Sequence, residues 1–81
     1  MENQLHLQFY NSNTLLVVNK QGKIKIIYTP FRVVCISQTQ FIAVGVRVYV
    51  DEVLSNDKDE LLFIVFNTPY SYKHFKLPIM F

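Results

Sequence analysis

The sequence is short of several residue types, and each shortage excludes a class of protein. Cys35 is its only cysteine, which excludes an intramolecular disulfide framework and a cysteine-based zinc cluster within one chain. Its only glycines, Gly22 and Gly45, are too few for the glycine-rich motifs that cradle phosphate. No stretch approaches the roughly 18 consecutive apolar residues of a membrane-spanning helix, and the N-terminal residues lack the basic start and apolar run of a secretory signal. We therefore expect a cytoplasmic protein with no membrane partner.

Apolar side chains are what the chain has in excess. Its 81 residues are 51% hydrophobic and 17% charged. This length predicts one domain, residues 1–81, around a single core. So many apolar residues in a chain with so much surface predict one of two outcomes. Either a sheet closes into a barrel that hides both of its faces, or another chain covers the second face of an open sheet.

The clearest structural pattern is an alternation of valines between residues 41 and 53. Valine occupies every second position from Val44 to Val50, and this period of two predicts a half-buried strand with Val48 central to the core. Gly45 interrupts that strand, and we expect a bulge or a sharp bend there that uses the backbone freedom of glycine.

The rest of the chain predicts further short strands joined by turns. Residues 11–13 and 19–22 favour turns, and Pro30 favours a corner or a sheet edge. Residues 55–59 predict a hairpin tip. A helix capped at Asn56 or Asp57 is the alternative there, and a single helical turn within residues 55–60 is also compatible with the sequence. The expected strands cover residues 4–9, 14–18, 23–28, 31–36, 41–53, 61–66 and 70–75.

Side-chain alternation also predicts which faces point outward. In the strand over 23–28, Ile24, Ile26 and Tyr28 share one face, and Lys23 and Lys25 share the other. We expect the two lysines to point toward solvent. The apolar C-terminal residues 77–81 are expected to pack over an open end of the sheet or to dock on a partner.

Together these patterns predict an all-β fold. We expect a small antiparallel meander of six or seven strands, curled at Gly45 and Pro30 into an SH3-like or OB-like barrel or into a strongly bent sheet. The run from Gly45 through Val53, followed by a hairpin and a last aromatic strand, resembles the rhythm of small SH3-like barrels. Such a likeness concerns the fold and does not settle the function.

The sequence offers no catalytic or metal-binding constellation. His6 and His74 have no second ligand at the short spacing that presents two groups to one ion. Cys35 lies in an apolar run, which favours a small buried side chain over a reactive thiolate. Asp51 and Glu52 are adjacent and would point to opposite faces of a strand. We therefore expect no enzyme activity, no metal and no cofactor.

Charge is distributed unevenly along the chain. The formal net charge is +2, yet Glu2 is the only acid in the first fifty residues and residues 51–60 contain five. Solvated turns and sheet edges commonly carry such clusters. A net charge this small does not by itself indicate a polyanion partner.

Aromatic residues beside basic ones form the candidate binding surface, because such pairs stack bases or hold a peptide. We expect Tyr70, Tyr72 and His74 on one face of the last strand. The same tyrosines are also compatible with core positions whose hydroxyls reach the rim. The candidate binding residues are Arg32, Arg47, Tyr49, Tyr70, Tyr72, Lys73 and His74.

Two functions follow from these surfaces. The first is a non-catalytic protein-interaction module or small accessory protein, whose partner is another protein or a second copy of the chain. The second is binding of single-stranded nucleic acid. The near-neutral charge, the acidic residues 51–60 and the absence of tryptophan speak against nucleic acid, so we favour the first function. The residues that would contact nucleic acid are Lys23, Lys25, Arg32, Arg47 and Tyr49.

Overall fold

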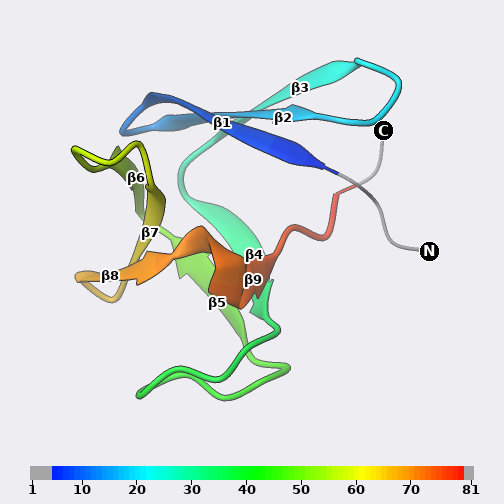
Figure 1. Ribbon diagram of the computed structural model, residues 1–81. Coiled ribbons are helices and arrows are strands. Elements are labelled where there is room, and N and C mark those ends of the chain that lie inside the picture. The colour runs from blue at the N-terminus through cyan, green and yellow to red at the C-terminus, as the bar shows by residue number, and fades with distance from the viewer. Residues whose placement is uncertain (1–4, 80–81) are drawn as a thin grey trace.

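Alternating β-branched and aromatic residues, separated by turn residues, form nine short strands and one 3₁₀ helix in the computed structural model, which describes residues 5–79 (Figure 1). The predicted all-β class is confirmed, with more strands than the six or seven expected. The elements are β1 (His6–Asn11), β2 (Thr14–Val18), β3 (Ile24–Tyr28), β4 (Phe31–Cys35), β5 (Arg47–Val50), β6 (Glu52–Ser55), β7 (Leu61–Val65), β8 (Thr68–Ser71), η1 (Tyr72–His74) and β9 (Phe75–Lys76).

The strands pair into three antiparallel sheets of three strands each, in the orders β1-β2-β3, β5-β4-β9 and β6-β7-β8. The chain leaves the first sheet at Thr29 and Pro30, so the predicted corner at Pro30 is confirmed. It passes from the second sheet to the third through Asp51 alone. The pairings within residues 5–79 do not close a barrel, and the expected barrel is therefore not confirmed.

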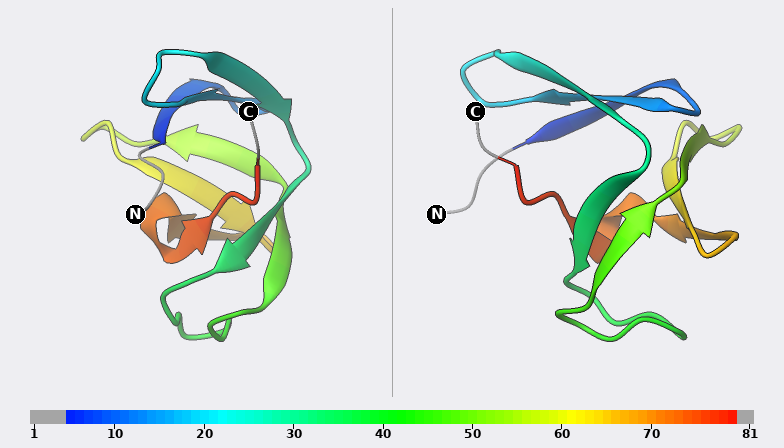
Figure 2. Two further views of the ribbon diagram at one scale, coloured as in Figure 1. Left: turned by 90° about the vertical axis from the view of Figure 1, so that its right-hand side faces the viewer. Right: turned by 180° about the vertical axis from the view of Figure 1, so that it is seen from behind.

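One hydrophobic core fills the space among the three sheets (Figures 1 and 2). Phe63 lies at its centre, with its ring edge-on to Phe31 at a centroid distance of 5.5 Å and tilted against Phe75 at 6.1 Å. Leu77 is buried and Ile79 packs against the core, whereas Met80 and Phe81 lie outside the described residues. The buried apolar residues are Leu15, Val17, Phe31, Val33, Cys35, Ile42, Val48, Val50, Val53, Leu61, Phe63, Val65, Phe75 and Leu77.

The predicted valine strand is correct only in its second half. Val48 is buried as expected, but Val44 and Val46 are 58% and 44% exposed. The physical reason is Gly45, which adopts φ +92°, while the Val46 N–H donates to the Ala43 carbonyl at 3.2 Å. The Gly45 N–H donates to the Cys35 carbonyl at 2.7 Å and the Cys35 N–H donates to the Val46 carbonyl at 2.9 Å, so Gly45 and Val46 both oppose Cys35. The predicted bulge at Gly45 is therefore confirmed, and only the strand expected before it was wrong, because the chain makes a tight turn there.

The predicted outward face of residues 23–28 was wrong, because Lys25 pairs with the fully buried Val17 and so shares the core side of the sheet with Ile27. Lys23 and Lys25 are exposed, but Ile24, Ile26 and Tyr28 are exposed as well, at 64%, 50% and 66%. The residue of β3 that packs against the core is Ile27, which pairs with the fully buried Leu15 of β2. The face that bears two isoleucines and a tyrosine therefore points away from the core.

The last predicted strand was also wrong in its geometry. The chain ends β8 at Ser71 and turns through η1, because the Ser71 hydroxyl accepts a bond from the Lys73 N–H at 3.3 Å and the Phe75 N–H donates to the Tyr72 carbonyl. Tyr70, Tyr72 and His74 therefore do not alternate along one strand. At the other predicted irregularity, residues 55–60, the structure has a hydrogen-bonded hairpin turn and no helical turn.

Candidate interaction surfaces

The outer face of the β5-β4-β9 sheet carries three cations and a tyrosine. Arg32 pairs with Tyr49, and Val34 pairs with both Arg47 and Lys76. Directly opposed residues on antiparallel strands share a face, so these five side chains point the same way. The three cations and Tyr49 are exposed and Val34 is half-buried. We call this surface, made of Arg32, Val34, Arg47, Tyr49 and Lys76, the basic face.

Sequence reasoning found three of these five residues and missed Val34 and Lys76. Arg32, Arg47 and Tyr49 were predicted as binding residues, and the structure brings them together. Lys76 was missed because β9 has only two residues and pairs with a strand about forty residues earlier in the chain, so no local sequence pattern predicts its position.

The other predicted binding residues lie elsewhere, on β8 and η1. Tyr70 stands edge-on to Phe75 at 6.0 Å, and both Tyr70 and Tyr72 pack against the core. The alternative expectation, that these tyrosines are core residues, describes them better. His74 Nδ1 lies 3.0 Å from the Ser37 carbonyl oxygen, so the imidazole contacts the start of the β4–β5 connection.

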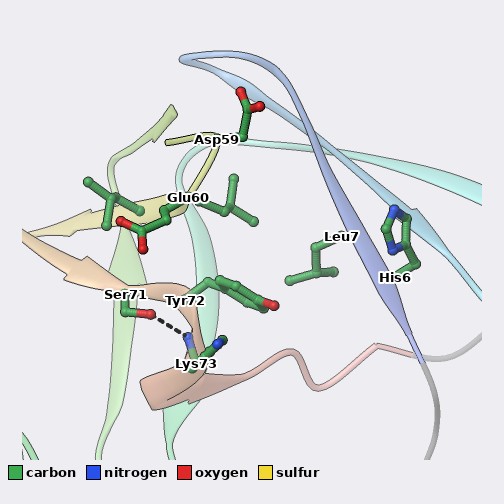
Figure 3. A pocket seen from close by; sticks show the side chains of 9 residues that line it. His6, Leu7, Asp59, Glu60, Ser71, Tyr72 and Lys73 are labelled. Carbon is green, nitrogen blue, oxygen red and sulfur yellow. Dashed lines mark hydrogen bonds between the residues drawn. The ribbon is translucent and has the colours of Figure 1, made fainter. Parts of the chain in front are cut away.

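Tyr72 and Lys73 instead line a pocket of about 400 Å³ between β1, the β6–β7 turn and η1 (Figure 3). Leu7 and Tyr72 point toward each other across it. Its charged groups have opposite signs, and the Glu60 carboxylate accepts a bond from the Asn56 amide at 2.8 Å within its own hairpin. The pocket therefore presents no group set that favours one ligand chemistry. Its lining is His6, Leu7, Asp59, Glu60, Leu61, Leu62, Ser71, Tyr72 and Lys73.

A shallower groove of about 440 Å³ runs beside the basic face, between β3, β4 and residues 77–79. Lys25 and Arg32 line it together with the apolar side chains of Ile27, Phe31 and Leu77. Lys25 is thus brought near the basic face through Arg32. Lys23, predicted beside Lys25, does not line the groove and lies at the β2–β3 turn.

The outer face of the β1-β2-β3 sheet is apolar where β2 and β3 meet. Cross-strand pairs place Leu16 opposite Ile26 and Val18 opposite Ile24. Thr14 and Tyr28 form the next pair along the same face, where Thr14 is buried and Tyr28 is exposed. None of these six positions is charged. We call the surface made of Thr14, Leu16, Val18, Ile24, Ile26 and Tyr28 the apolar face.

Reactive groups within the described part of the chain are few. Cys35 is buried, with its sulfur 3.4 Å and 3.7 Å from the carbonyl oxygens of Ser37 and Ile42. Residues 5–79 contain no cluster of three histidine, cysteine or acidic side chains that could hold a metal ion. They also contain no helix with the length and hydropathy needed to cross a membrane.

Comparison with known proteins gives no family, since no protein-family model, curated protein or solved structure matches the chain.

Proposed function

We propose that the chain is a non-catalytic protein-interaction module whose docking surface is the apolar face. The observation that supports this is the outward position of Ile24, Ile26 and Tyr28 on one sheet, beside half-buried Leu16 and Val18. Full burial of one such side chain contributes about 1.5–3 kcal/mol. Three of them would therefore contribute several kcal/mol, the scale of a weak protein complex.

A second copy of the chain is the occupant that this face fits best. A two-fold interface places the same patch of each copy against the other, so any charge on the patch would meet its own sign. The apolar face has no charged position and is one face of a β-sheet, which permits sheet-on-sheet packing. Ile26 pairs with Leu16 at its middle and would lie near the two-fold axis.

Sedimentation equilibrium over a range of concentrations tests the proposal. We expect the parent to dimerise and Ile26→Lys and Ile26→Glu to be monomeric when measured alone. An equimolar mixture of the two variants should dimerise again, because opposite charges then meet near the axis. Val44→Lys, which alters an exposed valine outside the apolar face, should leave dimerisation unchanged. Two results together would overturn the proposal. The parent would stay monomeric, and the proteins that co-purify with the parent would also co-purify with Ile26→Lys.

Binding of single-stranded nucleic acid is the second candidate, and the basic face is the observation that favours it. Arg32 lies directly across from Tyr49, Arg47 lies two residues before Tyr49 on the same face, and Lys76 lies on the far strand of that face. Cations beside an aromatic ring are the usual composition of a single-strand site. Three phosphate contacts would lower the logarithm of the binding constant by about 2 per decade of salt. Asp51 directly follows β5, so we expect no micromolar binding at physiological salt.

Titration of a labelled oligonucleotide at low and at physiological salt separates the two functions. If nucleic acid is the ligand, Arg32→Glu/Arg47→Glu should abolish binding and Tyr49→Ala should remove about 1–3 kcal/mol of stacking. Lys23→Glu/Lys25→Glu, on the first sheet, should have a smaller effect. Micromolar binding at physiological salt that the first charge reversal abolishes would make nucleic acid the working function.

We further propose that residues 31–76 form a small SH3-like barrel to which the β1-β2-β3 sheet is added. Two features support the proposal: β9, the last strand, returns to pair with β4, the first strand of this segment, and the Asp51 N–H donates to the Ile64 carbonyl at 2.8 Å where β5 leads into β6. Persistent amide protection at Asp51 in hydrogen exchange would support a barrel in which β5 continues into β6 without a break, and fast exchange there would contradict it.

We also propose a cytoplasmic location. Its support is Cys35, a free and fully buried thiol in a chain without a second cysteine. Fractionation of the native host tests this, and recovery of the protein outside the cytoplasm would contradict it.

A further inference from the structure

The connection between β4 and β5, residues 36–46, forms a projection with an apolar tip. It extends beyond the ends of both strands and away from the β1-β2-β3 sheet in all three views (Figures 1 and 2). Phe41 is 73% exposed, and Val44 and Val46 are also exposed. No residue from Ile36 to Val46 is charged. We call this segment the finger.

Internal hydrogen bonds fix the shape of the finger. The Thr39 hydroxyl accepts bonds from the N–H groups of Phe41 at 3.2 Å and Ile42 at 2.9 Å. Ile42 is buried in the core and anchors the middle of the segment. At its base, the Gly45 N–H donates to the Cys35 carbonyl at 2.7 Å. The exposed tip is therefore ordered before any partner arrives, which lowers the entropy lost on binding.

Cations surround the base of the finger. Arg47 follows it directly, and Lys76 shares the basic face with Arg47 across Val34. The helix η1, which contains Lys73, is held to the same base, because the Ile36 N–H donates to the His74 carbonyl at 2.8 Å.

The acidic residues within residues 5–79 lie away from the finger. None of the elements that build the finger and its base (β4, residues 36–46, β5, η1 and β9) contains an acid. Five of the six acids of the chain lie in residues 51–60. That segment is held beside the β1–β2 turn by the bond from the Val53 N–H to the Ser12 carbonyl, and its hairpin points away from the finger (Figure 1). The end that bears the finger thus carries cations and no acid, whereas Lys20, Lys23 and Lys25 lie with the β1-β2-β3 sheet and Lys58 lies in the acidic hairpin.

We propose that the finger inserts into the surface of an anionic lipid membrane while the basic face contacts the lipid headgroups. Stable peripheral binding needs two signals, buried apolar groups and attraction to anionic lipid, and both lie at one end of this molecule. A convex tip suits a lipid surface, which yields to its shape, whereas a protein partner would need a matching pocket. The sequence predicted no membrane partner because it lacks a spanning segment, which this mode of binding does not need, so the proposal departs from that prediction. The apolar face is not involved, so the inference is independent of the proposed protein interaction.

Co-sedimentation with lipid vesicles is the first test. We expect binding to vesicles that contain phosphatidylserine, weaker binding at higher salt, and little binding to pure phosphatidylcholine. Phe41→Ser and Arg47→Glu should each lower the affinity about tenfold or more. Matched controls are Phe66→Ser, at an equally exposed phenylalanine in the β7–β8 turn, and Lys20→Glu, in the β2–β3 turn. Both controls should bind as the parent does.

Tryptophan fluorescence provides the second test, because the chain has no tryptophan of its own. Phe41→Trp should shift its emission to shorter wavelength and become protected from iodide when anionic vesicles are added, whereas Phe66→Trp should not change. The proposal would be overturned if the parent did not bind anionic vesicles at low salt. It would also be overturned if Phe41→Ser bound as tightly as the parent, since adsorption would then be purely electrostatic. Loss of a co-purifying protein on Phe41→Ser, without any vesicle binding, would assign the finger to a protein pocket instead.

Discussion

Asn19 and Asn56 perform the same task in two hairpin turns. The side-chain oxygen of each accepts bonds from the backbone N–H groups two and four residues later, at 3.0 and 2.9 Å for Asn19 and at 2.9 and 3.0 Å for Asn56. The fourth residue of each turn has a positive φ, +84° at Gly22 and +60° at Asp59. One local geometry therefore closes both the β2–β3 and the β6–β7 connections.

Replacement of either asparagine should destabilise the fold by a similar amount. We expect Asn19→Ala and Asn56→Ala each to lower the free energy of unfolding by about 1–2 kcal/mol, because two backbone N–H groups lose their acceptor. Chemical denaturation measures the loss. Asn19→Asp keeps the accepting oxygen and should lose less. Asn56→Asp keeps the oxygen too, but it replaces the amide that donates to the Glu60 carboxylate at 2.8 Å with a second carboxylate, so it should lose more than Asn19→Asp. Alanine variants as stable as the parent would show that water replaces the side chain without cost.

The positive φ of Asp59 predicts a stabilising substitution. Asp59→Gly should raise the free energy of unfolding by up to about 1 kcal/mol, because a left-handed conformation costs an L-residue energy that glycine does not pay. Gly22→Asp, the reverse exchange in the matching turn, should lower it by a similar amount. Two thermal unfolding curves that shift in the same direction would contradict the equivalence of the two turns.

These turns show what the sequence reveals and what it does not. The turn at residues 19–22 was predictable because glycine marks the left-handed position, whereas at Asp59 nothing marks it and only the polar character of the hairpin tip was predictable. The inward residue of β3 was ambiguous, because apolar residues occupy both faces of that strand and only packing against Leu15 selects Ile27.

The candidate surfaces were predictable to the extent that they are local. Arg47 and Tyr49 share a strand, so alternation alone placed them on one face. Lys76 joins them through a pairing between distant segments, and the finger depends on where the valine strand begins, which a turn at Gly45 decides. Neither could be derived from local periodicity.

The buried position of Val48 predicts that a charge there prevents folding. Val48→Asp would place a carboxylate in the core, at a cost of several kcal/mol against a total stability of about 5–15 kcal/mol. We expect loss of cooperative unfolding in circular dichroism. Tyr49→Asp, at the exposed neighbouring position, is the matched control and should remain folded. A thermal midpoint for Val48→Asp within a few degrees of the parent would show that this face is not buried.

The backbone conformation of Gly45 predicts a penalty that is separate from packing. A Cβ atom added at Gly45 would meet no heavy atom within 4 Å, so there is space for a Cβ atom at this position. At φ +92°, however, a β-branched residue is strained, and Gly45→Val should lower the free energy of unfolding by about 1–2 kcal/mol or more.

Gly45→Asn is the control for this strain, because asparagine tolerates positive φ better than valine, and it should lose clearly less stability. The effect should also be local, since the Gly45 N–H donates to the Cys35 carbonyl at the base of the finger. Relative to the parent, Gly45→Val should therefore speed up hydrogen exchange more at residues 42–46 than in β7. If Gly45→Val were as stable and as well protected as the parent, the base of the finger would accept valine without strain. The backbone conformation of Gly45 would then not be what orders the tip that inserts into the membrane.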